Sequence, residues 1–277
     1  MEKRMLFMDL DGTLLNDEKQ ITQGNHQALE QALERGHGVV IATGRPLKSA
    51  MDQAHKLGLD KPGCYLIAYN GALIYDWEKQ EQIFARTLEI PVVLEVFDFV
   101  NARGFHLQTY DTWQVLVEPR CENAILRRYC NLIHMDYRVI SNVHTDLKEN
   151  PVKVLIIEPD DRAAVLALQE ELRITMSDKV DTFFSNPTYL EVVPAGMSKG
   201  EAVKMLCRAM NVPIENAVAV GDAANDLSMI EMAGIGVAMA NGTDEVKAVA
   251  DYITQRDNNH DGIAEVVEKF FSHRVHS

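Results

Sequence analysis

The stretch that decides the fold class of this chain is MLFMDLDGT, residues 5–13. Its first four residues are apolar and are followed at once by charged and turn-forming residues, which indicates a short buried strand. Asp9 and Asp11 come directly after this strand. Functional groups of α/β sheets gather beyond the carboxyl ends of strands, and side chains two residues apart in extended backbone point the same way. The stretch therefore predicts an α/β sheet with two carboxylates at one strand end.

Short apolar strands alternate with amphipathic helices at both ends of the chain. Up to about residue 87, the expected elements are strands at Met5–Met8, Val39–Ala42 and Tyr65–Tyr69, a helix over Thr22–Arg35, and a second helix between the last two strands. After about residue 194, they are strands at Val218–Val220, Ile235–Met239 and Tyr252–Thr254 and helices over Asp226–Ala233, from about Asp244, and over Ile263–Phe271. This alternation is typical of βαβ units. We therefore expect an α/β fold with a doubly wound parallel-sheet (Rossmann-like) core.

The middle of the chain has a different pattern. Its expected helices lie near Val92–Asn101, Glu122–Leu132 and Asp161–Leu172, and its expected strands at Phe105–Thr109, Trp113–Glu118, Lys153–Glu158, Val180–Ser185 and Tyr189–Val193. These strands alternate polar with apolar residues, which predicts a sheet with one face toward solvent or a cleft. We expect an inserted α+β cap domain at 88–191 and a core domain formed by 1–87 and 192–277.

Composition restricts the partners that this chain can bind. Its 277 residues include 41 acidic and 27 basic side chains, which give a net charge of -14. This charge disfavours a nucleic-acid surface or docking on anionic lipid, but it allows a small phosphorylated substrate in a locally positive site. The four cysteines are scattered, and no apolar stretch approaches the roughly 18 residues of a membrane span. We expect a cytoplasmic protein that binds neither nucleic acid nor membrane; nothing indicates its oligomeric state.

Two other segments suit an anion. Thr43-Gly44-Arg45-Pro46 follows an expected strand, and it offers a hydroxyl, a close-approach glycine and a proline suited to the first helical position. An ordinary strand-to-helix turn has the same composition. In Ser198-Lys199-Gly200-Glu201, the spacing of a capping box puts Lys199 in the first turn of a helix, where a cation is unfavourable. Lys199 is either a phosphate-neutralising group or a solvated surface lysine.

A second acidic segment, GDAAND at residues 221–226, ends another expected strand. Asp226 by itself is explained as a helix N-cap, but Asp222 would lie beside the first strand of a doubly wound sheet. Carboxylates that converge from separate segments repel one another without a cation, and Mg²⁺ prefers such oxygen ligands together with a substrate phosphate. We therefore expect Mg²⁺ as the cofactor. A nucleotide-sugar transferase, which also binds a metal through a DxD pair, stays an alternative.

In this order, DLDGT, TGR, SKG and GDAAND resemble the four motifs of haloacid dehalogenase-like phosphatases. The segment Tyr69-Asn70-Gly71-Ala72 is similar to one of their Cof-type branch, whose cap is inserted between the second and third motifs. The resemblance covers nearly the whole chain. It implies a Mg²⁺-dependent phosphatase of small phosphorylated metabolites, such as sugar phosphates, that acts through an aspartyl-phosphate.

The resemblance also implies a role for each matching residue. Asp9 would be the nucleophile and Asp11 the general acid and base. The metal ligands would be Asp9, the backbone carbonyl of Asp11, and Asp222. The phosphoryl group would be held by the amide of Leu10 and by Thr43, Gly44, Lys199 and Asn225. Asp226 would support these residues from behind, and Arg45 would either line the site or be structural. Asn70 and Gly71 are expected to shape a loop rather than to touch substrate.

Several rival functions share part of this pattern. A phosphomutase would use the same phospho-aspartate and return the phosphoryl group to its substrate. A dehalogenase has no evident use for Asp11, and the expected lack of membrane spans speaks against a P-type ATPase. A receiver-like regulatory module would keep its phospho-aspartate as a signal, but receivers are far shorter than 277 residues.

Overall fold

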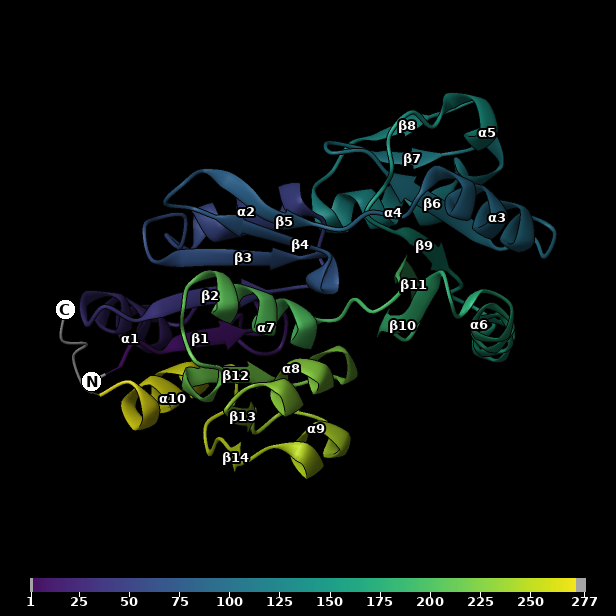
Figure 1. Ribbon diagram of the computed structural model, residues 1–277. Helices are drawn as coiled ribbons and strands as arrows, with labels where there is room; N and C mark the ends of the chain where they lie inside the picture. Colours follow the sequence, from purple (N-terminus) through teal and green to yellow (C-terminus); the bar gives the residue numbers. More distant parts are fainter. Residues whose placement is uncertain (1, 273–277) are drawn as a thin grey trace. The chain divides into compact units, whose positions relative to one another are not determined.

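The computed structural model describes residues 2–272 and contains two sheets, each in its own compact unit (Figure 1). One unit consists of the described residues up to Gly44, of Ala50–Phe84, and of the residues from Ser198 onward. The other consists of Arg45–Ser49 and Ala85–Met197. The expected cap domain, 88–191, lies within this second unit. Its last strand, β11 (Tyr189–Pro194), continues past residue 191 because it pairs along its length within the second sheet.

The sheet of the first unit has eight strands and a doubly wound order. Across the sheet they are β14 (Tyr252–Ile253), β13 (Ile235–Ala238), β12 (Ala217–Gly221), β1 (Met5–Met8), β2 (Gly38–Ala42), β3 (Cys64–Ala68), β4 (Leu73–Asp76) and β5 (Glu81–Ala85). The six strands from β14 to β3 are parallel, and β4 is antiparallel to β3. The expected α/β fold with a doubly wound parallel sheet is therefore confirmed.

The helices of the first unit bury both faces of this sheet. They are α1 (Gln23–Glu34), α2 (Leu47–Lys56), α7 (Lys199–Ala209), α8 (Leu227–Met232), α9 (Asp244–Val249) and α10 (Gly262–Phe270). Phe7 of β1 shares a buried cluster with Leu206 of α7 and Met229 of α8. The alternate residues Leu6 and Met8 are also fully buried. Because both sets of side chains are apolar, β1 reads as a continuous hydrophobic run, as a central parallel strand should.

The chain order reverses at β1, which lies between β12 and β2 (Figure 1). At such a switch point, the connections of neighbouring strands leave to opposite sides of the sheet and open a crevice beyond the strands' carboxyl ends. The segments that follow β1, β2 and β12 are those that begin with Asp9, Thr43 and Asp222. The fold therefore brings the acidic and anion-suited segments of the sequence to one edge.

The second unit is an α+β fold with a mostly antiparallel sheet. Its strands, in spatial order, are β10 (Val180–Asn186), β11, β9 (Val154–Ile157), β6 (His106–Tyr110), β7 (Val115–Val117) and β8 (Tyr137–Val139). Its helices are α3 (Ile90–Asn101), α4 (Ala124–Ile133), α5 (Val143–Asp146) and α6 (Arg162–Met176). Phe97 of α3 and Leu168 of α6 share a buried cluster with Leu107 of β6. That cluster supplies the second unit with a hydrophobic core of its own.

The polar residues of β6 and its neighbours are buried, so the expectation of one open sheet face is wrong for this region. Gln108 is fully buried, and its Nε2 donates a hydrogen bond of 3.1 Å to the hydroxyl of Tyr110. Lys153, which precedes β9, forms an ion pair of 2.7 Å with Glu191 of β11 while both side chains are buried. Polar side chains that satisfy one another produce the same alternation in sequence as polar side chains that face water.

Short or exposed elements were not expected from the sequence. β4 and β5 follow the 3₁₀ turn at Tyr69–Gly71, and β5 is largely exposed. β8 and α5 have only three and four residues. Elements of three to five residues contain too few repeats of a hydrophobic pattern for periodicity to indicate them.

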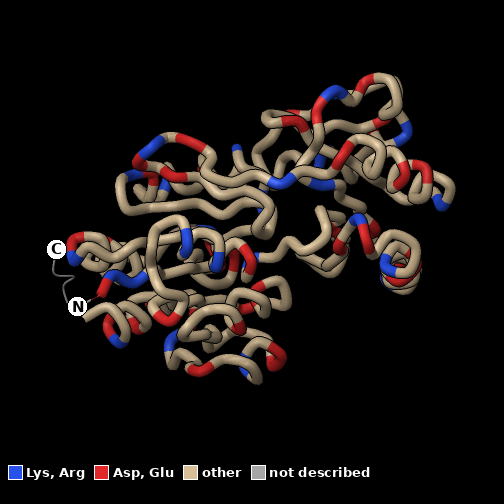
Figure 2. Tube along the Cα trace, viewed as in Figure 1, with Lys and Arg blue, Asp and Glu red and all other residues tan. Residues whose placement is uncertain are grey.

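Acidic and basic positions are interspersed along both units (Figure 2). Within residues 2–272, no helix combines the length and the apolar character that crossing a membrane requires.

A matched pair of isoleucines in the first sheet tests the burial pattern. Ile67 of β3 is fully buried, whereas Ile253 of β14 is 44% exposed. We expect Ile67→Ala to lower the free energy of unfolding by about 2–5 kcal/mol, because it removes apolar contacts and leaves a cavity. Ile253→Ala, the control, should cost less than about 1 kcal/mol. Urea denaturation measures both, and equal losses would contradict the assigned burial.

Candidate active site

Asp9 lies at the centre of the sheet edge, one residue after β1. Its backbone N–H donates a hydrogen bond of 3.1 Å to the carbonyl of Val220 in β12, which continues the pairing of the two strands. The residue is 7% exposed. Asp9 is therefore a nearly buried carboxylate at the switch point of the sheet.

The segment after β12 folds back on itself through Asp226. The Asp226 carboxylate accepts hydrogen bonds from the backbone N–H groups of Asp222 (3.0 Å) and Ala223 (3.1 Å). These bonds satisfy amides that would otherwise be unpaired where the strand turns into a helix. The Asp226 side chain is fully buried. Its carboxylate holds the turn in shape through these two hydrogen bonds, and it also contacts Lys199.

Lys199 joins the two acidic segments. It is the first residue of α7, and Ser198 caps that helix by accepting a hydrogen bond of 3.2 Å from the N–H of Glu201. The Nζ of Lys199 lies 2.5 Å from Oδ1 of Asp9 and 2.6 Å from Oδ1 of Asp226. Its predicted place in the first turn is confirmed, and the lysine is buried rather than solvated.

Burial and the neighbouring charges shift the pKa values of the residues in this cluster. Burial raises the pKa of Asp9 to about 8; the nearby Lys199 ammonium opposes the rise, and the Asp226 and Asp222 carboxylates add to it. Burial and the charge of Asp226 raise the pKa of Asp222 to about 6. Burial works to lower the pKa of Lys199, but the Asp226 and Asp9 carboxylates outweigh it, and the pKa is raised. One ammonium among three carboxylates leaves an excess of buried negative charge.

The donor set of the cluster suits a hard divalent cation. Carboxylate oxygens of Asp9, Asp222 and Asp226 all lie within 4.8 Å of one another. Oxygen ligands from a few carboxylates are what Mg²⁺ and Ca²⁺ take in proteins. A cation there would offset the excess negative charge that raises the pKa of Asp9 and Asp222. The cluster is therefore a candidate metal centre, in which Asp9 and Asp222 are the better ligands because both oxygens of Asp226 already accept hydrogen bonds.

Gly12 leaves room for the Asp222 carboxylate. Its φ is +87°, and a Cβ on this residue would lie 2.5 Å from Oδ2 of Asp222. Thr13, the next residue, is fully buried and donates a hydrogen bond of 2.7 Å to Oδ1 of Asp222. Sequence reasoning assigned no role to Thr13, although a hydroxyl that directly follows a DxD-Gly turn was a usable signal.

Asp11 has a different environment from Asp9. Its carboxylate is 39% exposed, and Oδ1 lies 2.9 Å from the Nζ of Lys19. Its charge still contributes to the raised pKa of Asp222, so it lies near the cluster. The structure thus gives one DxD carboxylate a buried place among like charges and the other a place open to solvent.

Thr43, Gly44 and Asn225 come together around Asn70. The backbone N–H of Asn70 donates to the carbonyl of Thr43 (3.0 Å), and the Nδ2 of Asn225 donates to Oδ1 of Asn70 (3.2 Å). Gly44 lies against the same amide, since a Cβ on it would be 2.7 Å from Nδ2 of Asn70. Three of the expected phosphate-binding residues are therefore gathered by a residue expected only to shape a loop.

Leu10 and Arg45 are the other two residues of the expected site. Leu10 is fully buried next to Asp9. Arg45 lies in the segment Arg45–Ser49, which belongs to the second unit. Whether it lines the site around Asp9 therefore stays a prediction.

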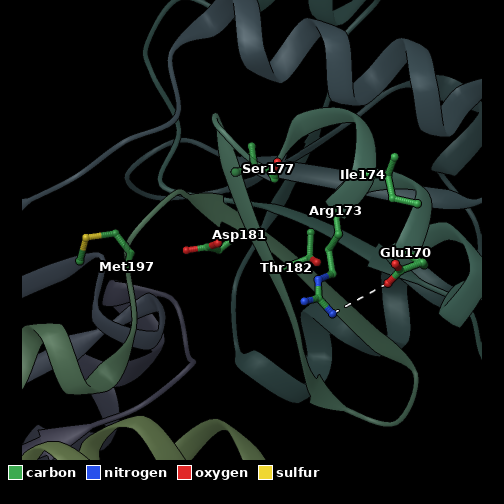
Figure 3. Close-up of a pocket in the computed structure, with 8 residues that line it drawn as sticks. Glu170, Arg173, Ile174, Ser177, Asp181, Thr182 and Met197 are labelled. Carbon is green, nitrogen blue, oxygen red and sulfur yellow. Dashed lines mark ion pairs between the residues drawn. The ribbon is translucent and has the colours of Figure 1, made fainter.

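A separate hollow of about 590 Å³ lies in the second unit, beside α6 and β10 (Figure 3). Arg173 and Glu170 line it and pair with each other at 3.9 Å. No residue of the expected site lines this hollow. It therefore has no part in the candidate active site.

Similarity to known proteins shows which family this chain belongs to. A sequence model of the haloacid dehalogenase-like hydrolases matches residues 6–267. The chain therefore belongs to this family, which confirms the expected family and enzyme class. It is 30% identical to the 5-amino-6-(5-phospho-D-ribitylamino)uracil phosphatase YcsE of Bacillus subtilis (strain 168), over 95% of this chain and 94% of that protein.

Solved structures agree with this assignment. The crystal structure of a haloacid dehalogenase-like hydrolase from Bacteroides thetaiotaomicron is similar with a TM-score of 0.85 and 33% identity, over 97% of this chain and 99% of that one. The subclass IIB sugar phosphatase BT4131 has the same fold, with a TM-score of 0.82 and 24% identity over 97% and 99% of the two chains.

A lysine pair on α7 tests the cluster. We expect Lys199→Met to lower the free energy of unfolding by about 3–5 kcal/mol, because it leaves Asp9 and Asp226 buried without their partner. Lys204→Met on the same helix is the control; Lys204 is half-exposed, and its loss should cost at most about 0.5 kcal/mol. Chemical denaturation in the presence of a chelator measures both. A small effect of Lys199→Met would remove Lys199 from its stabilising role.

Two glycines with left-handed backbone test the space beside Asp222. Gly12→Ala and Gly104→Ala both introduce strain, because φ is +87° and +79°. Only Gly12 faces a carboxylate, whereas nothing lies within 4 Å of a Cβ on Gly104. We expect Gly12→Ala to cost at least about 1 kcal/mol more in unfolding free energy than Gly104→Ala. If denaturation gives the same loss for both, the Cβ at Gly12 is accommodated without moving Asp222.

Proposed function

We propose that this protein is a Mg²⁺-dependent phosphatase that hydrolyses small phosphorylated metabolites through a phospho-aspartate on Asp9. The observation that carries the proposal is the position of Asp9. It is a buried carboxylate at the switch point of the sheet, 2.5 Å from Lys199 and clustered with Asp222 and Asp226. Membership of the haloacid dehalogenase-like hydrolase family and the 30% identity to a phosphatase support it.

Asp9 and Asp222, with the backbone carbonyl of Asp11, are the residues that would hold Mg²⁺. Asp226 would hold Lys199 and the turn after β12 in place, since its oxygens already accept from that lysine and from two backbone N–H groups. Bound Mg²⁺ would neutralise charge on the transferring phosphoryl group and on the carboxylates around it.

The first half of the reaction transfers the phosphoryl group to Asp9. Lys199 binds Oδ1, so Oδ2 is the oxygen that attacks phosphorus. An O–P bond forms to Asp9 while the ester P–O bond breaks, and protonated Asp11 gives its proton to the leaving alkoxide. Asp11 suits this role because its carboxyl is partly exposed, so that both the leaving group and, later, the attacking water can reach it.

The second half returns Asp9 to its initial state. Asp11, now a carboxylate, takes a proton from water as the water oxygen attacks the phosphorus of the aspartyl-phosphate. The bond between Asp9 and phosphorus breaks, and inorganic phosphate leaves. Lys199 stabilises the Asp9 carboxylate both as nucleophile and as leaving group, because its ammonium lies beside Oδ1 throughout.

We propose sugar phosphates and related polyol phosphates as the substrate class. YcsE, by name, acts on a phosphoribityl compound, and the sugar phosphatase BT4131 has the same fold. We further propose that residues 88–191 act as a cap that selects the leaving group, because this segment forms a folded unit with a core of its own. The four buried thiols suit a reducing cytoplasm.

Release of inorganic phosphate from a panel of phosphorylated metabolites tests the proposal. We expect release that needs Mg²⁺, stops with a chelator, and falls at least about 1,000-fold in Asp9→Asn, because the covalent route is lost. Asp160→Asn, the same change at an exposed loop position, is the control and should retain full activity. Comparable turnover by Asp9→Asn would overturn the assignment of the nucleophile, and release without any divalent cation would overturn the role of Mg²⁺.

A further inference from the structure

The turn at Tyr69–Gly71 contacts three segments of the candidate active site. The backbone of Asn70 donates to Thr43, which follows β2. The side chain of Asn70 accepts from Asn225, which follows β12. Gly71 packs directly on the carbonyl oxygen of Ser198, the N-cap of α7. A single three-residue turn therefore lies among the segments that carry Thr43, Lys199 and Asn225.

The backbone of this turn is unusual. The φ angles of Tyr69 and Asn70 are 51° and 54°, and that of Gly71 is 110°. Left-handed backbone is unfavourable for residues other than glycine, and asparagine tolerates it better than most. Consecutive left-handed residues that persist beside a functional site suggest that their geometry serves the site.

The amide of Asn70 has an unsatisfied donor. The residue is 3% exposed, its Oδ1 accepts from Asn225, and its Nδ2 has no hydrogen-bond partner in the structure. Buried amide nitrogens in native proteins nearly always have a partner, so one without any calls for an explanation. A ligand that accepts hydrogen bonds is the explanation that fits a donor beside an active site.

The surroundings of this Nδ2 indicate an anion. Gly44 lies directly against this amide and carries no side chain that would crowd it. A Cβ on Gly44 would be 2.7 Å from Nδ2 and 3.1 Å from Oδ1 of Asn70. The amide of Asn225 is held beside it, with one of its two N–H groups given to Asn70 and the other left for a second acceptor. Two neighbouring amides that each keep an N–H group in reserve suit a ligand rich in acceptors, and a tetrahedral oxyanion supplies them.

We propose that Asn70 binds the phosphoryl group: its Nδ2 donates to a phosphoryl oxygen, and its Oδ1 orients Asn225 to do the same. This inference rests on the proposed phosphatase function and adds a binding residue to it. The turn at Tyr69–Gly71 thus does more than shape a loop. It places a donor next to Gly44, and it fixes the amide of Asn225 through a hydrogen bond between side chains.

Calorimetric binding of inorganic phosphate to the full chain, in the presence of Mg²⁺, tests the inference. Asn70→Gly keeps the left-handed backbone and removes the amide. Asn70→Asp keeps the acceptor for Asn225, removes the donor and adds a negative charge, so its loss of affinity should be at least as large as that of Asn70→Gly. We expect both to raise the Kd for phosphate about 10-fold to 100-fold, as loss of a hydrogen bond to a charged group does. The affinity for Mg²⁺ alone should stay unchanged, which a merely structural role of Asn70 would not predict.

Asn211→Gly is the matched control, because Asn211 is an exposed asparagine that also has left-handed backbone, with φ of 53°. It should bind phosphate like the unchanged protein. Thermal unfolding of each variant shows that the chain is folded, and if Asn70→Gly does not fold, Asn70→Asp decides. Phosphate binding that is unchanged in a folded Asn70 variant overturns this inference and leaves the proposed function standing. An unchanged protein that neither binds phosphate nor releases it from any ester overturns both.

Discussion

The contact on which the site depends is the ammonium of Lys199 between Asp9 and Asp226. The three residues come from the end of β1, the start of α7 and the turn after β12, and all are nearly or fully buried. Without the lysine, the carboxylates of Asp9 and Asp226, with Asp222 beside them, would meet as uncompensated charges that are largely shielded from water. The same excess of negative charge that makes the cluster difficult to bury also makes it suitable for a cation.

The sequence predicted the six parallel strands of the first sheet well because they are continuous apolar runs that end in polar turns, whereas β4 and β5 were not expected. It also placed Lys199 in the first turn of a helix, since the spacing of Ser198 and Glu201 is local information. The prediction of a sheet face open to solvent or a cleft was wrong around β6, β9 and β11 of the second sheet. Polar residues such as Gln108 and Lys153 alternate with apolar ones in the expected way, but they are buried and paired, and pairing partners far apart in sequence leave no local signal.

The convergence of Asp9 and Asp222 followed from strand-end reasoning, and the β1–β12 pairing places the two segments side by side. The position of Asn70 did not follow from any such rule. The role proposed for it rests on left-handed backbone, on an amide nitrogen without a hydrogen-bond partner and on the approach of Gly44, which are properties of the folded chain. The different environments of Asp9 and Asp11 are also tertiary, because burial and the partner Lys19 set them apart and the two-residue spacing does not.

The pairing of β1 with β12 has a consequence for biosynthesis. Met5 pairs with Ala217, so the strand that carries Asp9 lacks one of its two neighbours until more than two hundred further residues have been made. At about 5–20 residues per second, this delay is roughly 10–40 s. The segment Ala85–Met197 is synthesised in full during that time and has its own hydrophobic core. The middle of the chain can therefore fold before its first strand has both neighbours, and the candidate active site is among the last parts of the molecule to form.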